Sequence, residues 1–251
     1  MRTDDEKQFI KRLHDLAEAA ADRGTYCFTD FLSESEYSDL IREGPYSSPY
    51  EAYGGHESAE RVMVRFGDPE SAGCEEPFPI KIIKISQGSV KFSDKLSHRD
   101  YLGAVLNLGI DRKVTGDIIT DGTTGYLFCE EKIADYIIEN LVRVRHTNVS
   151  CEGADEVPQD IRPKLMRVEV QVSSERLDAV IAHILKLPRT RAADLFRAER
   201  VFVNGKMTPD RTYVPKEGDI ISVRGFGRFR YAGLSHITKK GKSSIVAERY
   251  V

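Results

Sequence analysis

The residues with the clearest chemistry are four arginines beside the stretch ERVFVNGKM, residues 199–207: Arg189, Arg191, Arg197 and Arg200. A guanidinium group holds several N–H donors in a planar fork, and this fork matches the oxygen atoms of a phosphate. A solvated basic surface without a partner would show the same residues. The segment therefore indicates a phosphate-binding surface as one of two interpretations.

The distribution of charge along the chain bears on this choice. The net charge is only −3, but residues 160–251 hold 19 Lys and Arg against 10 Asp and Glu. Residues 1–159 hold 18 basic against 30 acidic residues. A chain that is acidic in front and basic behind is typical of a tail domain that meets a polyanion, most often nucleic acid. The basic part is therefore the first place to expect RNA.

The C-terminal tail adds more basic residues, and aromatic residues lie between them. The basic members are Arg228, Arg230, Lys239, Lys240 and Lys242, and the aromatic members are Phe226, Phe229 and Tyr231. Aromatic rings can stack on unpaired bases while the cations bind phosphates. The alternative for the rings is packing under a C-terminal hairpin, and we favour that alternative.

Signs of catalysis are weak in the front part of the chain. It contains no G-x-G-x-x-G after a strand and no G-x-x-x-x-G-K-[ST], so no nucleotide cofactor is indicated. His56-Glu57 lacks the second histidine of a zinc-protease helix. Glu60 and Arg61, close to the pair Gly54-Gly55, are the best place for catalysis, but a surface ion pair is the interpretation we favour. We expect a protein without enzymatic activity, cofactor or metal.

The cysteines and the apolar segments indicate the compartment. Cys27, Cys74, Cys129 and Cys151 are scattered without a C-x-x-C pair, so neither a zinc site nor a disulfide framework is expected. No apolar run approaches the roughly 18 residues of a membrane span, and the N-terminus lacks the layout of a secretory signal. These features predict a cytoplasmic protein with reduced thiols.

The elements that position these residues fall into three expected domains. Residues 1–76 form a mixed helix and strand domain, with amphipathic helices over 5–21 and 33–42 and a strand over 61–66. Gly24 ends the first helix, and Ser33 or Ser35 caps the second. The segment 67–79 interrupts all periodicity and marks the boundary.

Residues 77–160 show the order β-α-β-β-α-β of a ferredoxin-like split βαβ domain. The expected strands are 80–86, 117–120, 126–129 and 147–151, and the expected helices are 101–108 and 132–144. This order predicts a four-stranded sheet under two helices. Tyr126 and Phe128 lie on a strand where some RNA-binding modules stack bases, but we favour a structural or protein-contact role.

Residues 166–251, after a polar linker over 152–165, read as a basic module. A strand over 166–172 either completes the middle sheet or starts this module. Helices follow over 175–185, with Ser173 or Ser174 as the N-cap, and over 189–197. Val201 and Val203 then share one strand face before Asn204-Gly205, a type I′ turn dipeptide, and a strand follows over 219–223. The chain as a whole is predicted to be a multidomain α+β protein.

The basic module resembles the S4 RNA-binding domain. The matching segments are Arg176-Leu177-Asp178, Arg189 with Arg191 and Ala192, Val201 to Lys206, and Gly218-Asp219-Ile220. The resemblance implies that two helices and the adjoining turn form an RNA surface. Together with the basic tail it predicts RNA contact by Arg176, Arg189, Thr190, Arg191, Arg197, Arg200, Asn204, Lys206, Arg224, Arg228, Lys239 and Lys240.

Two residues depart from the S4 pattern. Pro188 stands where the S4 family usually has a serine, so a capping hydroxyl is missing. Glu199 stands where glycine is favoured, and it either takes the left-handed region at a cost of about 1 kcal/mol or shifts the turn. Its negative charge would weaken attraction for phosphate.

The resemblance extends over nearly the whole chain to the bacterial YlmH family. The segments that carry it are Tyr53 to Arg61, His98 to Gly103, Leu108-Gly109-Ile110, Gly116-Asp117-Ile118 and Arg224 to Phe229. This family implies a cytoplasmic, non-enzymatic RNA-binding protein, encoded near cell-division genes. It also implies association with the large ribosomal subunit, in quality control of stalled peptidyl-tRNA complexes.

The expected partners are therefore ribosomal RNA of the large subunit, with tRNA as a second candidate, and neither DNA nor a membrane. An RNA-modifying enzyme with an appended S4 domain is one alternative, because S4-like modules are often joined to catalytic domains. A protein-docking scaffold linked to cell division, with an acidic front face, is another.

Overall fold

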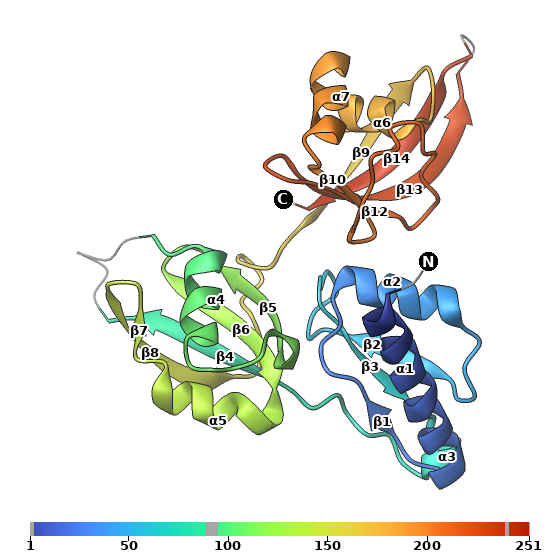
Figure 1. Ribbon diagram of the computed structural model, residues 1–251. Helices are drawn as coiled ribbons and strands as arrows, with labels where there is room; N and C mark the ends of the chain where they lie inside the picture. The colour runs from blue at the N-terminus through green and yellow to red at the C-terminus, as the bar shows by residue number, and fades with distance from the viewer. Residues whose placement is uncertain (1–2, 89–94, 239–240, 251) are drawn as a thin grey trace. The chain divides into compact units, whose positions relative to one another are not determined.

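The computed structural model describes residues 3–88, 95–238 and 241–250 of the chain. Its contacts divide the chain into two compact units, Met1–Arg162 and Pro163–Val251. In Figure 1 the first unit runs from blue to yellow-green and the second from yellow to red. Each unit has hydrophobic cores of its own.

Two capped helices open the first unit. α1 (Asp4–Arg23) starts at a capping box between Thr3 and Glu6, and it ends at Gly24, which has φ 57°. α2 (Glu34–Glu43) starts at a second capping box between Ser33 and Glu36. The helices predicted over 5–21 and 33–42 are confirmed, and Ser33 is the cap of the second.

A small antiparallel sheet lies against these helices. Its strands, in spatial order, are β1 (Cys27–Phe28), β3 (Met63–Phe66) and β2 (Tyr50–Tyr53). Leu13 and Ala17 of α1, Leu40 of α2 and Phe66 of β3 are buried in one core. The strand predicted from Arg61 begins at Met63, and the segment 67–79 contains a short helix, α3 (Pro69–Ala72), that was not predicted.

The rest of the first unit is the predicted ferredoxin-like fold with one additional strand. Its elements, in chain order, are β4 (Ile80–Gln87), α4 (His98–Leu106), the 3₁₀ turn η2 (Arg112–Val114), β5 (Thr115–Thr120), β6 (Thr124–Glu130), α5 (Glu131–Asn140), β7 (Arg143–Val144) and β8 (Thr147–Ala154). All strands are antiparallel, and their spatial order is β5-β6-β4-β8-β7. The first four follow the order expected of a split βαβ sheet.

The helix predicted over 132–144 is too long. α5 ends at Asn140, and Arg143–Val144 instead pairs with β8 as the fifth strand. Leu141 and Val144 are buried on the same side as the inner face of α5. A helix and this short strand therefore present similar apolar residues, and periodicity does not separate them.

The two faces of the middle sheet have different cores. Ile83, Ile85 and Leu127 pack under the helices. Tyr126 and Phe128 point to the other face, where they are 5% and 0% exposed and pack with Val157. Base stacking by these two rings is therefore excluded, and the structural role that the sequence favoured is confirmed.

The second unit is one six-stranded antiparallel sheet covered by two helices. Its elements are β9 (Leu165–Val172), α6 (Leu177–Ile184), α7 (Arg189–Arg197), β10 (Val201–Val203), β11 (Lys206–Met207), β12 (Ile220–Val223), β13 (Gly227–Ile237) and β14 (Ser243–Tyr250). The spatial order is β11-β10-β12-β13-β14-β9. β9 pairs with β14 along its whole length, so this strand belongs to the basic module.

The structure of the second unit tests two predictions, one about its aromatic side chains and one about the start of α6. Phe229 and Tyr231 are buried in the core with residues of α6 and α7, so packing, which the sequence favoured over base stacking, is confirmed for these two rings. The predicted cap at Ser173 or Ser174 is wrong. α6 begins after Arg176, and the hydroxyl of Ser174 accepts only from the Arg176 N–H in the loop before it.

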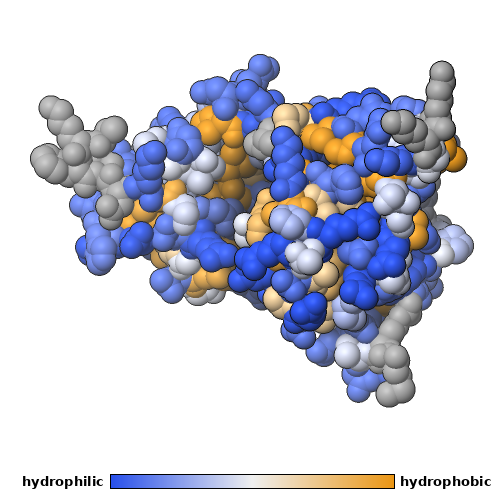
Figure 2. Space-filling view, turned by 90° about the horizontal axis from the view of Figure 1, so that it is seen from above, coloured by the Kyte–Doolittle hydropathy of each residue, from blue (hydrophilic) through white to orange (hydrophobic). Residues whose placement is uncertain are grey.

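Hydrophilic residues cover most of the surface seen in Figure 2, and hydrophobic residues lie between them in small patches. None of the helices in the described ranges has the length and the apolar character that crossing a membrane requires.

Candidate nucleic-acid interface

The outer face of α7 carries the first group of predicted RNA residues. Ala192, Leu195 and Phe196 turn inward and are buried, so helical geometry directs the intervening residues to solvent. The exposed residues are Arg189, Thr190, Arg191 and Arg197. The helix starts directly after Pro188, which has extended backbone angles. The sequence prediction that these four residues share one helix is therefore confirmed.

The arginines of α7 keep most of their guanidinium surface in solvent. Nη2 of Arg189 donates to Oγ of Ser173 at 2.8 Å. Nη1 of Arg197 lies 3.2 Å from the Asp194 carboxylate, but the Arg197 side chain is 78% exposed. Exposed ion pairs of this kind contribute little to folding. These side chains are therefore positioned to exchange their present partners for phosphate oxygens.

A second group of predicted residues lies on the opposite face of the sheet. Val201 and Val223 face the helices, so Phe202 and the residues registered with it face away. The Arg224 guanidinium stacks over the Phe202 ring at 4.3 Å, and that of Arg228 lies 4.5 Å from the Tyr250 ring. The RNA residues predicted as one surface thus divide between two faces of the unit.

Three further predicted residues, Arg200, Lys206 and Arg176, lie within the described part of the chain. Arg200 is exposed just after α7, and its carbonyl accepts from the Arg224 N–H at 2.9 Å. Lys206 is partly buried in β11. Arg176 binds both carboxylate oxygens of Asp178, at 3.2 and 2.9 Å. Lys239 and Lys240 lie outside the described residues.

Asn204 belongs to the architecture of the turn. Its amide donates to Oδ1 of Asp219 at 2.8 Å, and its Oδ1 accepts from the Ile220 N–H at 2.8 Å. Asn204 has φ 48° and Gly205 has φ 71°, which matches the predicted type I′ turn. Both polar ends of the Asn204 side chain therefore take part in the turn, and its contact with RNA stays a prediction.

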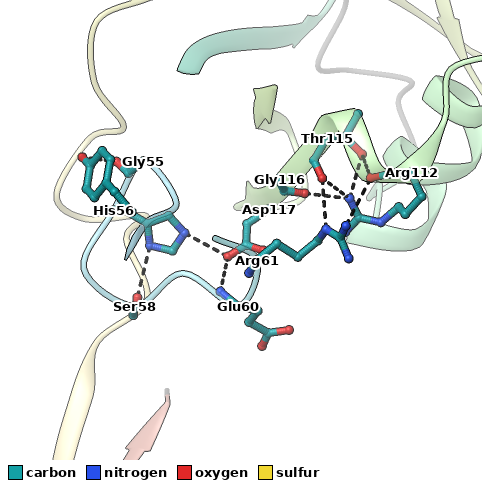
Figure 3. Close-up of polar contacts among 10 residues, drawn as sticks. Gly55, His56, Ser58, Glu60, Arg61, Arg112, Thr115, Gly116 and Asp117 are labelled. Atoms are coloured by element: carbon teal, nitrogen blue, oxygen red, sulfur yellow. Dashed lines mark hydrogen bonds and ion pairs between the residues drawn. The ribbon is translucent and has the colours of Figure 1, made fainter. Parts of the chain in front are cut away.

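Asp117 holds the glycine-rich loop of the first unit against β5 (Figure 3). Its Oδ2 accepts from the Glu60 N–H at 2.6 Å and lies 3.1 Å from Nε2 of His56. Its Oδ1 accepts from the Arg61 N–H at 3.2 Å. Nδ1 of His56 is 3.3 Å from Oγ of Ser58. One carboxylate therefore fixes the whole segment from His56 to Arg61.

Two arginines extend this network to the main chain. Nε of Arg61 donates to the Thr115 carbonyl at 3.1 Å, and its Nη2 donates to the Phe31 carbonyl at 2.5 Å. Nη1 of Arg112 donates to the carbonyls of Thr115 and Gly116 at 2.7 and 2.9 Å. Burial lowers the pKa of both groups, that of Arg112 to about 10. The Arg61 guanidinium is therefore held between the Phe31 main chain and the start of β5, and the surface ion pair of Arg61 with Glu60 stays a prediction.

The contacts of this network hold the loop from His56 to Arg61 against β5. Ser58, His56 and Asp117 follow one another as in a hydrolytic triad, but the Ser58 side chain is buried, with the residue only 9% exposed. Among the residues that the structure describes, no three His, Cys, Asp or Glu side chains gather as a metal site requires.

Comparison with known proteins places an RNA-related match on the middle of the chain. The family model described as "Putative RNA-binding domain in YlmH" matches residues 74–157. These residues form the ferredoxin-like fold, for which the sequence favoured a structural or protein-contact role. The two base-stacking candidates of this fold, Tyr126 and Phe128, are buried, so neither ring explains the RNA-related match.

A curated relative extends the match beyond this region. The chain is 30% identical over 256 residues to "Ribosome-associated protein quality control protein P2" of Bacillus subtilis, which covers 98% of this chain and 95% of that protein. The solved structure of "Cell division protein ylmH from Streptococcus pneumoniae" is 23% identical, with a TM-score of 0.48, over 61% of this chain and 93% of that chain. The nearly full-length relationship to the Bacillus protein shows that the chain belongs to the YlmH family.

Proposed function

We propose that this protein is a cytoplasmic RNA-binding protein that docks on structured RNA through the outer face of α7. Its target is ribosomal RNA of the large subunit, with tRNA beside it, in quality control of stalled peptidyl-tRNA complexes. The observation that carries the proposal is the exposed position of Arg189, Arg191 and Arg197 on one helix. Arginine forks bind phosphates without reading sequence, as recognition of a structured RNA requires.

The relatives support the choice of a ribosomal target. The Bacillus subtilis protein is named for ribosome-associated quality control, and it matches this chain over almost all of both lengths. The YlmH family model is described as RNA-binding. The excess of basic residues after residue 160 agrees with a polyanionic partner.

We further propose that the protein acts by binding and carries out no catalysis. The Asp117 carboxylate is occupied by two main-chain N–H groups in addition to His56. A triad needs a nucleophile that meets substrate, whereas Ser58 is buried. The variant Ser58→Ala is therefore expected to bind the same RNA as the natural protein does. The network is better suited to holding the loop in place.

The test is cosedimentation with small subunits, large subunits, large subunits carrying peptidyl-tRNA, and tRNA alone, over a range of salt concentrations. The variant Arg189→Glu/Arg191→Glu should lose large-subunit binding. Its log–log salt slope should fall by about 0.7–0.9 for each lost phosphate contact. The variant Lys7→Glu/Lys11→Glu in α1 changes the net charge equally and should bind as the natural protein does. An unchanged slope in the α7 variant would sink the proposal.

A further inference from the structure

A basic hollow of about 500 Å³ lies in the ferredoxin-like fold, between α4 and the chain that leaves α5. Arg99, Gly103 and Asn107 line it from α4 and the residue that ends it, at spacings of four residues. Asn140 lines it from the end of α5, Arg143 from β7, and Arg145 from the turn after β7. The lining shares no residue with the basic faces of the second unit or with the Asp117 network.

The charge of this hollow is strongly positive. Arg99, Arg143 and Arg145 are exposed, and Asp100 is the single acid in the lining. The Asp100 carboxylate accepts from the N–H and Oγ–H groups of Ser97 at 2.8 and 2.6 Å, and it lies 3.6 Å from Nε of Arg145. These hydrogen bonds keep the Asp100 pKa below its usual value. The carboxylate therefore serves the start of α4, and the arginines leave a surplus of positive charge.

The lining also contains apolar residues, and two of them, Gly103 and Val142, are exposed. Gly103 lies inside α4, where glycine destabilises a helix relative to alanine. A Cβ on Gly103 would meet nothing within 4 Å, so no contact within the protein requires a glycine. Val142 beside it is 63% exposed. A flat ring could approach the helix backbone closely at this point.

We infer that this hollow receives an unpaired nucleotide of RNA, with its phosphates at the arginines and its base against the Gly103 face. Unstacked bases are held by flat contacts and by polar groups on their edges, and amides such as that of Asn107 supply such groups. All lining residues belong to the segment 74–157, which matches the YlmH RNA-binding family model. The inference rests on the proposed function and assigns a second contact to the same RNA.

The test uses the full chain and two labelled RNA hairpins that differ only by one bulged nucleotide. The natural protein should bind the bulged hairpin about tenfold more tightly. Gly103→Leu should abolish this preference and leave affinity for the paired hairpin unchanged, because the added side chain fills the hollow. The thermal stability of Gly103→Leu should not fall. Ala21→Leu, on an exposed position of α1, is the matched control.

The outcomes separate this inference from the proposed function. Arg189→Glu/Arg191→Glu should weaken binding of both hairpins equally. If both hairpins bind and respond to the α7 variant but show no preference for the bulge, the hollow is not a nucleotide site. If Gly103→Leu keeps the preference for the bulged hairpin, the hollow is likewise not a nucleotide site. A glutamate-rich peptide that binds the natural protein but not Gly103→Leu would also contradict the inference, because the hollow would then be a peptide site. If neither hairpin binds, the proposed function fails as well.

Discussion

Two groups of arginines show how differently the same side chain is used in the two units. Arg61 and Arg112 in the first unit donate to main-chain carbonyls of buried residues, and burial lowers the pKa of each. Arg189 and Arg191 in the second unit lie exposed on α7. Basic residues alone therefore do not locate an RNA surface. What distinguishes the groups is whether their guanidinium groups donate to main-chain carbonyls of buried residues.

This comparison has an energetic consequence. A buried carbonyl that loses its donor pays a desolvation penalty of about 1–3 kcal/mol, because water does not replace the donor. An exposed guanidinium exchanges freely with water, so its removal changes folding stability by no more than about 0.5 kcal/mol. Substitutions in the first group should act on the fold, and those in the second on RNA binding.

The largest effect is expected for Arg112→Met, which keeps the apolar stem and removes every donor. The Gly116 carbonyl and the Thr115 hydroxyl then lose this donor, whereas the Thr115 carbonyl keeps Nε of Arg61. The free energy of unfolding of the first unit should fall by about 3 kcal/mol. Pulse proteolysis in urea, read by mass spectrometry, reports the two units separately. Arg191→Met is the matched control and should change neither unit. A loss below about 0.5 kcal/mol in Arg112→Met would remove the distinction between the two groups.

The second prediction concerns pH and again separates the units, because all four cysteines lie in the first. Burial raises the pKa of Cys129 to about 12 and that of Cys151 to about 11, from an ordinary value of 9.0. The unfolded chain therefore releases these protons at lower pH than the folded chain. Stability from the neutral thiols is complete below pH 9 and is lost as pH rises toward the folded values.

The expected slope for the first unit is up to about 1.4 kcal/mol per pH unit for each thiol above pH 9. Unfolding of both units should be followed between pH 8.5 and 10, before Tyr213 and Tyr231 of the second unit contribute. Cys129→Ala should flatten the slope of the first unit, whereas Cys74→Ser, at an exposed position, should leave it unchanged. If the free energy of unfolding of the second unit fell equally steeply between pH 8.5 and 10, the thiols would not be the cause of the pH dependence.

Local signals in the sequence were enough to predict much of the fold. The capping pair of Ser33 and Glu36, the turn at Asn204-Gly205 and the β-α-β-β-α-β order all depend on residues close in the chain. Such signals act through short-range hydrogen bonds and backbone preferences, which a single sequence displays. The exposed arginines of α7 followed directly from helical periodicity.

The parts that were missed depend on contacts between distant segments. Asp117 is 57 residues from Glu60 and 61 from His56, and no local pattern links them. The basic hollow joins Arg99 to Arg143 and Arg145 across two helices and a turn. Arg191 and Arg228 lie on opposite faces of the second unit, and only the pairing of its strands shows this. In each case the sequence shows the charged residues, but the fold determines which distant residues they contact.

The smallest predicted effect separates backbone strain from charge within the second unit. Lys186 and Glu199 each follow a helix, α6 and α7, in the left-handed region with φ 54° and 53°. Glycine at either position should stabilise the second unit by about 0.5 kcal/mol, because it relieves this strain but adds freedom to the unfolded chain.

RNA affinity should respond to the same two changes in opposite directions. Glu199→Gly removes a negative charge beside Arg200 and should strengthen binding about twofold, whereas Lys186→Gly removes a positive charge and should weaken it by a similar factor. Thermal unfolding and fluorescence anisotropy at two salt concentrations measure both quantities on the same samples. Because strain relief is common to the two variants, affinities that move in the same direction would show that the loop conformation controls binding. Opposite shifts that shrink at high salt would assign the effect to the charges on this face.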